Sequence, residues 1–274
     1  MAAASRRGAP GSTRRKGEGS ISSSSARATH VRTCGPSSAP GGWSLWHATT
    51  VTRDDVRVPT AQAYDRVVDE YVRRNTEVPA DFARFRAEFA KAVPAGGRIA
   101  DLGCGPGRDA ARFRAAGLRA VGIDASGRMA RCALDDGVPV ARADIRLVPL
   151  RHGTLDGIWS AASLLHVPRD EVPDTLRSWW RCLRPGGVLA VSTSMGDHEG
   201  WETWPYDPAS QASTAGLRRW FVHHRPDALV ALLGDAGFAV HLTRERESHR
   251  RWVQILASRP GTAPEAHSLA RAPR

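Results

Sequence analysis

Residues 101–107 read Asp-Leu-Gly-Cys-Gly-Pro-Gly and connect two regular elements. The apolar run 98–102 is typical of a short buried strand, and residues 108–116 have the pattern of a helix that Gly117 ends. Glycines permit a tight turn and let a ligand approach the backbone closely. The N-terminus of the following helix offers unpaired N–H groups and partial positive charge. The stretch therefore predicts a strand–loop–helix unit that binds a ligand.

The spacing of this loop narrows the kind of ligand. Gly103, Gly105 and Gly107 give G-x-G-x-G rather than the G-x-G-x-x-G of dinucleotide sites. Asp101 stands at the carboxyl end of the strand, where its carboxylate would repel a pyrophosphate and would suit a ligand with an ammonium group. A nicotinamide-dependent dehydrogenase is therefore disfavoured.

Strand and helix patterns alternate through the rest of the chain. Two helices are predicted before the loop, over 60–72 and 81–93. The strands predicted after it span 118–123, 138–142, 155–160, 188–194, 238–243 and 252–258, and the helices span 126–134, 170–183 and 227–236. Repeated βα units of this length predict an α/β fold with a doubly wound, mostly parallel sheet that helices cover on both faces. The last two strands, joined only by a loop, are expected to be antiparallel.

Acidic residues follow three successive predicted strands. Asp101 ends the first, Asp124 ends the second and Asp144 follows the third. Asp124 lies near the offset of roughly 20 residues expected for an acid that reads ribose hydroxyls. Asp144 can accept from an adenine amino group while Met129 and Ile145 pack on the ring. Each acid alone is equally well explained as a helix cap or turn residue, but ligands of open α/β sheets bind at this edge.

These motifs together resemble the class I S-adenosylmethionine-dependent methyltransferases over roughly residues 64–258. The likeness includes the glycine loop, Gly122-Ile123-Asp124, Ala143-Asp144, and segments 155–160 and 183–187. Segments 232–238 and 252–257 are similar to the end of members that act on small molecules. The resemblance implies a seven-stranded Rossmann-like sheet whose last strand is antiparallel, with S-adenosylmethionine as cofactor.

The resemblance also implies cofactor roles for Asp101, Gly103, Gly105, Asp124, Asp144 and Ile145. Tyr64, with Asp65, resembles the N-terminal helix that many members close over the cofactor. The complete set of candidate cofactor-binding residues is Tyr64, Asp101, Gly103, Cys104, Gly105, Gly107, Asp124, Ala125, Met129, Asp144, Ile145 and Ala161.

The acceptor side of the site is expected at residues 160–166, after the fourth strand. His166 is a candidate general base, or else a histidine packed against that strand and hydrogen-bonded to backbone. His223 and His224 line the acceptor pocket or form a solvated connector. The sequence lacks the N-P-P-[YFW] motif of base-amino methyltransferases and a Pro-Cys pair, which argues against DNA-base chemistry. Cys104 receives no nucleophilic role, because methyl transfer from a sulfonium needs none.

Residues 195–225 interrupt the alternation with aromatic side chains. The segment carries Trp201, Trp204, Tyr206 and Trp220 among glycine, proline and serine. These form either an aromatic lid over the acceptor or a small core of their own. The candidate acceptor-binding residues are Trp201, Trp204, Trp220 and His223.

The net charge of +11 is distributed unevenly. Residues 1–50 contribute +6 and are rich in glycine, serine, alanine and proline, which predicts a disordered basic tail. Three origins are open for it: an organellar transit peptide, an inert tail, or an artefact of a downstream non-AUG start. Residues 51–258 are expected to form the methyltransferase domain, with a helical cap at 60–93, an aromatic insertion at 195–225 and a second tail at 259–274.

The remaining composition fits a cytoplasmic protein. The four cysteines show no C-x-x-C pair and no metal-ligand spacing, so reduced thiols and no metal are expected. No apolar run reaches the roughly 18 residues of a membrane span. The expected activity is direct in-line methyl transfer to a small-molecule acceptor, by a monomer or homodimer. The alternatives are an RNA methyltransferase that uses the basic tail, although a nucleic-acid partner is disfavoured, and a non-catalytic cofactor-binding regulator.

Overall fold

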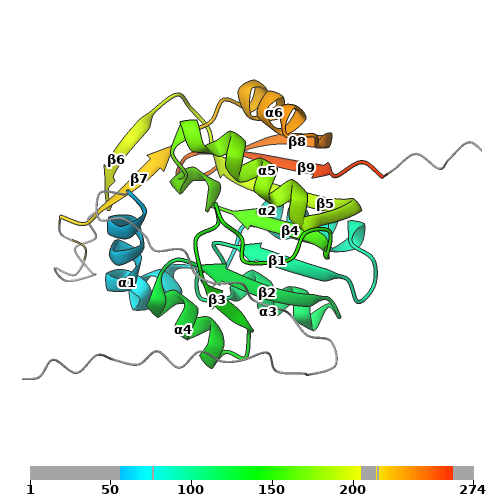
Figure 1. The fold of residues 1–274 in the computed structure, drawn as a ribbon. Helices are drawn as coiled ribbons and strands as arrows, with labels where there is room; N and C mark the ends of the chain where they lie inside the picture. Colours follow the sequence, from blue (N-terminus) through cyan, green and yellow to red (C-terminus); the bar gives the residue numbers. More distant parts are fainter. Residues whose placement is uncertain (1–55, 76, 205–213, 215, 262–274) are drawn as a thin grey trace, which may run out of the picture. The chain divides into compact units, whose positions relative to one another are not determined.

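The computed structural model describes residues 56–75, 77–204, 214 and 216–261 (Figure 1). The predicted tail 1–50 and Tyr206 lie outside the described residues, as do residues 262–274 of the second predicted tail. Within the described part of the chain, no helix is long and apolar enough to cross a membrane.

A seven-stranded sheet in the order β3-β2-β1-β4-β5-β9-β8 forms the centre of the fold. The strands are β1 (Arg98–Leu102), β2 (Arg119–Asp124), β3 (Val140–Arg142), β4 (Leu155–Ala161), β5 (Leu183–Ser194), β8 (Ala239–Glu247) and β9 (Arg251–Ser258). The pairs from β3 to β5 are parallel, and β9 is antiparallel to both β5 and β8. The predicted mostly parallel sheet with an antiparallel last strand is confirmed.

β5 begins earlier than the sequence predicts. Leu183 leaves the preceding helix in an extended conformation, pairs with Leu155 and is fully buried. The Pro-Gly-Gly turn at 185–187 thus lies inside the strand, where the register against β4 shifts. Burial of the leucine outweighs the helical pattern that precedes it.

Helices cover the two faces of this sheet. The helices after the first strand are α3 (Arg108–Ala115), α4 (Gly127–Asp135), α5 (Val172–Cys182) and α6 (Pro226–Asp235). On one face, α5 and α6 bury residues such as Trp179 and Leu233 against the strands. On the other face, α3 and α2 (Ala80–Ala92) pack aromatic side chains around Trp159. Phe82, Phe85 and Phe89 recur at helical spacing, which explains why α2 presents them together.

Helix α1 (Arg57–Arg74) lies beside a two-stranded hairpin of β6 (Glu199–Thr203) and β7 (Arg218–Val222) (Figure 1). Ala63 and Val67 of α1 pack with Trp204 and Leu217. Helix α1 contributes residues to the wall of the site described below, whereas α2 covers a face of the sheet. The hairpin is absent from the sequence prediction, because its strands are short and lie among turn-forming residues.

The last described residues are fixed against the domain. Arg259 stacks on Trp180 at 3.7 Å and donates to the carbonyl oxygen of Leu183 at 2.7 Å. Its backbone also pairs with Gly186 and Gly187. Arg259, which the sequence analysis placed in the tail, thus belongs to the folded domain.

Candidate functional site

A pocket opens where the parallel strands end. It encloses about 770 Å³ including its mouth, a size typical of small-ligand sites. Nine of the twelve candidate cofactor residues line it: Tyr64, Gly103, Gly105, Asp124, Ala125, Met129, Asp144, Ile145 and Ala161. The parallel register explains this convergence, because it aligns the carboxyl ends of β1, β2, β3 and β4.

The glycine loop needs its glycines for conformation and for space. Gly103 and Gly105 have φ of +73° and +54°, a region that favours glycine. A Cβ on Gly103 would lie 2.2 Å from the Cβ of Ser163. Gly107, with φ of +84°, is the N-cap of α3 and does not line the pocket; a Cβ added to it would lie 2.9 Å from the Cβ of Ala133. It shapes the loop from behind.

Asp124 is held in place by two backbone donors. The backbone N–H groups of Gly105 and Ser126 donate to its two carboxylate oxygens at 2.7 and 2.8 Å. Burial raises the pKa of Asp124 to about 6, although these hydrogen bonds favour the charged form. The side chain is thus a fixed, partly desolvated acceptor on the pocket wall.

Asp101 and Cys104 lie deeper than the sequence suggests. Asp101 is buried and accepts from the backbone N–H of Ala110, and burial, with Asp109 nearby, raises its pKa well above the usual range. Both residues line a second cavity, which shares Tyr71, Gly103 and Ala161 with the first. Burial also raises the pKa of the Cys104 thiol, which fits the absence of a nucleophilic role.

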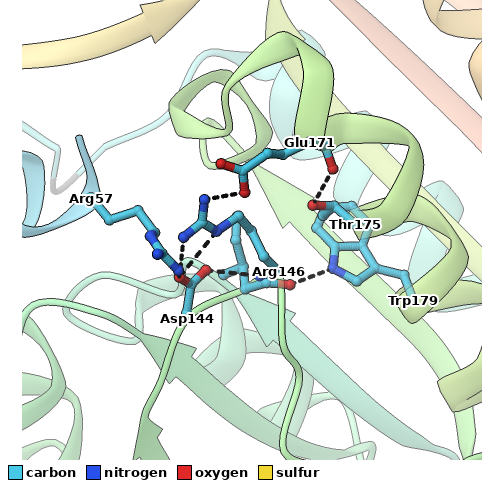
Figure 2. A network of polar contacts seen from close by, with 7 residues as sticks. Arg57, Asp144, Arg146, Glu171, Thr175 and Trp179 are labelled. Atoms are coloured by element: carbon cyan, nitrogen blue, oxygen red, sulfur yellow. Dashed lines mark hydrogen bonds and ion pairs between the residues drawn. The ribbon is translucent and has the colours of Figure 1, made fainter. Parts of the chain in front are cut away.

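Asp144 belongs to a network of charges at one end of the pocket. Figure 2 shows Arg57 reaching from α1 to its carboxylate, at 2.5 Å, beside the guanidinium of Arg146 at 3.1 Å. Arg146 also pairs with Glu171, and Trp179 donates to the carbonyl of Ile145. Burial raises the pKa of Asp144 to about 6 against the opposing effect of Arg57. Asp144 Oδ2 already accepts from the side chains of Arg57 and Arg146, and Oδ1 accepts from the backbone N–H of Arg146. An adenine amino group would therefore have to donate to the remaining acceptor site on Oδ1.

Tyr64 and His166 both line the pocket and contact each other. His166 ends the short helix η1 (Leu164–His166), and its Nε2 lies 2.9 Å from Tyr64 Oη. Its Nδ1 lies 2.6 Å from the carbonyl oxygen of Trp220, which only accepts, so Nδ1 carries the proton and Nε2 accepts from tyrosine. Burial lowers the pKa of His166 to about 3. The imidazole is therefore neutral at physiological pH.

None of the four candidate acceptor residues lines this pocket. Trp204 packs edge-on against the Tyr64 ring, and Trp201 packs against Trp220 on the hairpin. His223 pairs with Glu202 at 2.6 Å. The aromatic residues of the hairpin thus support Tyr64 and His166 from behind.

The sequence analysis missed Arg57, Tyr71 and Arg146, which line the cavity. Ala162 and Ser163 also line it and belong to the segment 160–166 that was expected on the acceptor side, but neither was singled out. Ala162 has φ of +56°, uncommon for a residue other than glycine, so the turn after β4 is strained at the pocket wall. No motif marks these positions, because their roles depend on contacts between distant segments.

Polar contacts hold α1 in place over the pocket. Asp65 Oδ1 accepts from the Ser126 hydroxyl at 2.6 Å and from the Arg128 backbone at 2.8 Å. Ser126 also caps α4 by accepting from Met129, as its position predicts. The start of α4 is thereby fixed both to α1 and to Asp124.

Comparison with known proteins shows the family. Residues 100–191 match the family described as methyltransferase domain. The chain is 30% identical over 173 residues to the malonyl-[acyl-carrier protein] O-methyltransferase of Enterobacter lignolyticus, covering 55% of this chain and 68% of that protein. The chain belongs to the S-adenosylmethionine-dependent methyltransferases.

Two further proteins are similar to this methyltransferase. Methyltransferase GfsG of Streptomyces halstedii is 36% identical over 110 residues, which are 36% of this chain and 38% of that protein. The crystal structure of the 1,6-didemethyltoxoflavin-N1-methyltransferase of Burkholderia thailandensis, with 1,6-didemethyltoxoflavin and S-adenosylhomocysteine bound, has a TM-score of 0.60 and 17% identity. The matched region covers 80% of this chain and 95% of the toxoflavin enzyme, so the two proteins share the fold.

The residues of the pocket fit S-adenosylmethionine, the cofactor of the family. A carboxylate suited to ribose hydroxyls, Asp124, lines the pocket together with two apolar side chains suited to adenine, Met129 and Ile145. The glycine loop leaves its backbone free of Cβ atoms on this wall. Within the described ranges, no group of three or more metal-ligating side chains is placed to hold a metal ion.

Proposed function

We propose that this methyltransferase transfers a methyl group from S-adenosylmethionine to a small-molecule acceptor by direct in-line displacement. The observation that carries the proposal is one pocket lined by two chemically different groups of residues. One group is the Asp144 carboxylate with apolar side chains, and the other is Tyr64 hydrogen-bonded to the neutral His166. A cofactor held by the first group leaves the second for the acceptor.

The described residues have distinct roles in this proposal. Asp124 accepts the ribose hydroxyls, Met129 and Ile145 pack on adenine, and Asp144 accepts from its amino group. The second cavity, which Asp101 and Gly103 line, takes the amino-acid end of the cofactor. When bound, the cofactor supplies a methyl group on a sulfonium whose thioether leaves readily. The protein supplies alignment and exclusion of water, which contribute effective molarities of about 10⁵–10⁸ M in well-oriented reactions.

His166 orients the acceptor by accepting a hydrogen bond from it, and it does not form a stable imidazolium. Its Nε2 lone pair becomes available when the Tyr64 hydroxyl turns away, and it then accepts from an O–H or N–H of the acceptor. The nearby cations Arg219 and Arg250 disfavour an imidazolium at this position. An acceptor that is already ionised needs no base at all.

The relatives support an acceptor of small-molecule or acyl type. The first is named for transfer to oxygen of malonyl-[acyl-carrier protein], and the toxoflavin enzyme is named for transfer to a nitrogen. The atom that is methylated thus differs among proteins that share this fold, because acceptor recognition depends on the segments around the pocket.

Methyl transfer from labelled S-adenosylmethionine to a panel of hydroxyl, amine and carboxylate acceptors tests the proposal. For a protonated acceptor, His166→Asn is expected to lower kcat by about 100-fold and to leave S-adenosylhomocysteine affinity within about threefold. His198→Asn, at an exposed histidine on the same side of the domain, is the control and should match wild type. Failure of the wild type to bind the cofactor or to label any acceptor would contradict the proposed function.

A further inference from the structure

Arg219 of β7 is a buried cation with little to neutralise it. The residue is 8% exposed, and within the described ranges its guanidinium makes one hydrogen bond, from Nη1 to Tyr64 Oη at 3.3 Å. Its Nε is buried without a hydrogen-bond partner. No carboxylate of the described residues forms an ion pair with it. A buried guanidinium in this state is unfavourable unless an anion joins it.

The cross-strand neighbour of Arg219 does not supply that anion. Glu202 stands directly opposite Arg219 in the hairpin, but its two oxygens contact His223 Nε2 at 2.6 Å and Arg250 Nη2 at 3.2 Å. Arg250 lies over the Phe221 ring at 4.7 Å, close to Arg219. The group of two arginines and one glutamate therefore keeps one positive charge.

Aromatic rings hold the guanidinium in a fixed place. Its central carbon lies 3.9 Å from the centroid of Trp204 and 4.8 Å from that of Phe221. Stacking of this kind offsets only part of the desolvation of a buried charge. It leaves the buried Nε and the Nη2 group without a hydrogen-bond partner among the described residues, while Nη1 donates to Tyr64. A guanidinium fork matches the two oxygens of a carboxylate.

The guanidinium contacts a residue of the pocket wall, although Arg219 itself does not line the pocket. Tyr64, which accepts its hydrogen bond, lines the pocket together with His166, and Phe221 contacts the His166 ring at 4.9 Å. We propose that Arg219 binds a carboxylate of the methyl acceptor, so that the substrates of this enzyme are carboxylic acids. The inference rests on the proposed function. A single residual positive charge matches a monoanionic carboxylate better than a phosphate dianion, and an ionised acceptor suits a histidine that stays neutral.

The test compares charged and neutral probes on the full chain with S-adenosylhomocysteine bound. The probes are acetate, malonate, succinate and benzoate, each beside its amide, at up to millimolar concentration, measured by calorimetry. Wild type is expected to bind at least one acid and to bind its amide about 10- to 100-fold more weakly. Binding of no acid, or equal binding of acid and amide, would overturn the inference.

The variants are Arg219→Met and Arg219→Lys, with Arg218→Met as the matched control. Arg218 is the exposed neighbour on the same strand and stacks on Trp201 at 5.5 Å. Arg219→Met should bind the acid about 10- to 100-fold more weakly than wild type. Arg219→Lys should lose less affinity for the acid, and Arg218→Met should lose none. Unchanged binding in Arg219→Met would contradict the role of this residue.

Two further measurements are the thermal midpoint and the affinity for S-adenosylhomocysteine. The first detects a folding defect in the variants, and the second distinguishes failure of the proposed methyltransferase function from failure of the carboxylate inference. Removing an uncompensated buried charge should leave the thermal midpoint of Arg219→Met without the acid at or above that of wild type, whereas a purely structural role predicts a fall. S-adenosylhomocysteine affinity should be unchanged in both Arg219 variants. Loss of cofactor binding in the wild type itself would instead contradict the methyltransferase function. Retained cofactor binding, with methyl transfer only to neutral acceptors, would overturn the carboxylate inference alone.

Discussion

Asp124 shows how one residue links the fold to cofactor affinity. Its two oxygens are fixed by backbone N–H groups of the glycine loop and of the turn before α4, and its pKa is raised to about 6 by burial. Ribose hydroxyls donate to a carboxylate, so cofactor binding favours the ionised form. Affinity should therefore depend on pH in a range where most carboxylates do not titrate.

The first prediction follows from that pKa. Below pH 6 the free protein binds a proton at Asp124 that the cofactor must displace, so S-adenosylhomocysteine affinity should fall by about tenfold per pH unit from this residue. Asp144, with the same pKa, adds to the slope. In Asp124→Asn, calorimetry between pH 5 and 8 should show weaker binding and a slope smaller by one proton. If the affinity of the wild type for S-adenosylhomocysteine did not change between pH 5 and 8, the assignment would be contradicted.

The second prediction concerns Gly103. Gly103→Ala places a Cβ against Ser163 and forces an alanine to a φ near +73°, so it should lower the free energy of unfolding by about 2–5 kcal/mol. Gly117→Ala is the control, because Gly117 has φ of +85° but open space around its Cβ. It should cost about 1–2 kcal/mol. Equal costs in denaturant unfolding would mean that the close approach of loop and turn is unimportant.

At this scale the sequence predicts positions better than partners. The offsets of Asp101, Asp124 and Asp144 from their strands are visible in the chain, and all three lie at the predicted edge. Their charge states are not visible there, because burial and the arginines around Asp144 come from other elements. Arg219 carries no sequence signal at all: it is one arginine among many in a basic chain, and only its burial without a counter-ion distinguishes it.

Helix α1 is the element that closes the site. Arg57 reaches Asp144, Tyr64 reaches His166, and Asp65 binds the start of α4. The helix thus contacts the segments that follow β2, β3 and β4. These contacts tie the position of α1 to the shape of the pocket.

The third prediction tests this coupling. Asp65→Ala removes two hydrogen bonds between α1 and the start of α4, so S-adenosylhomocysteine should dissociate faster and bind about tenfold more weakly. Asp69→Ala is the matched control, since Asp69 lies one turn further on α1 and its ion pair with Arg128 is exposed. Stopped-flow kinetics and hydrogen exchange of α1 measure the effect. Similar rates in the two variants would show that α1 does not control the pocket.

The elements themselves differ in how far sequence predicts them. Strands β1, β2 and β9 follow from apolar runs bounded by turn residues, and α2 follows from its phenylalanine spacing. The hairpin β6–β7 does not follow from the sequence in this way. Its five-residue strands are rich in charge and tryptophan, and they match neither the helical nor the strand spacing of apolar residues clearly. The sequence pattern also does not show that α1 docks at the pocket whereas α2 docks on a face of the sheet, because both helices have similar apolar spacing.

At the scale of the whole domain, the sheet brings together residues that are remote in sequence. Tyr64, His166 and Trp220 come from three parts of the chain, yet one hydrogen-bond chain connects them. The parallel register places four strand ends at one edge, and the antiparallel β9 fixes the far side of β5. The fold class follows from the alternation of elements alone, whereas the pocket needs this long-range assembly.

The central claim is that this pocket binds S-adenosylmethionine through Asp124. Calorimetric titration of wild type, Asp124→Ala and Asp69→Ala with S-adenosylmethionine, S-adenosylhomocysteine and NAD tests it most directly. The account predicts binding of both adenosyl ligands but not NAD, a loss of about 10- to 100-fold in Asp124→Ala, and little change in Asp69→Ala. Binding of NAD in place of the adenosyl ligands, or equal affinity in Asp124→Ala and wild type, would contradict it.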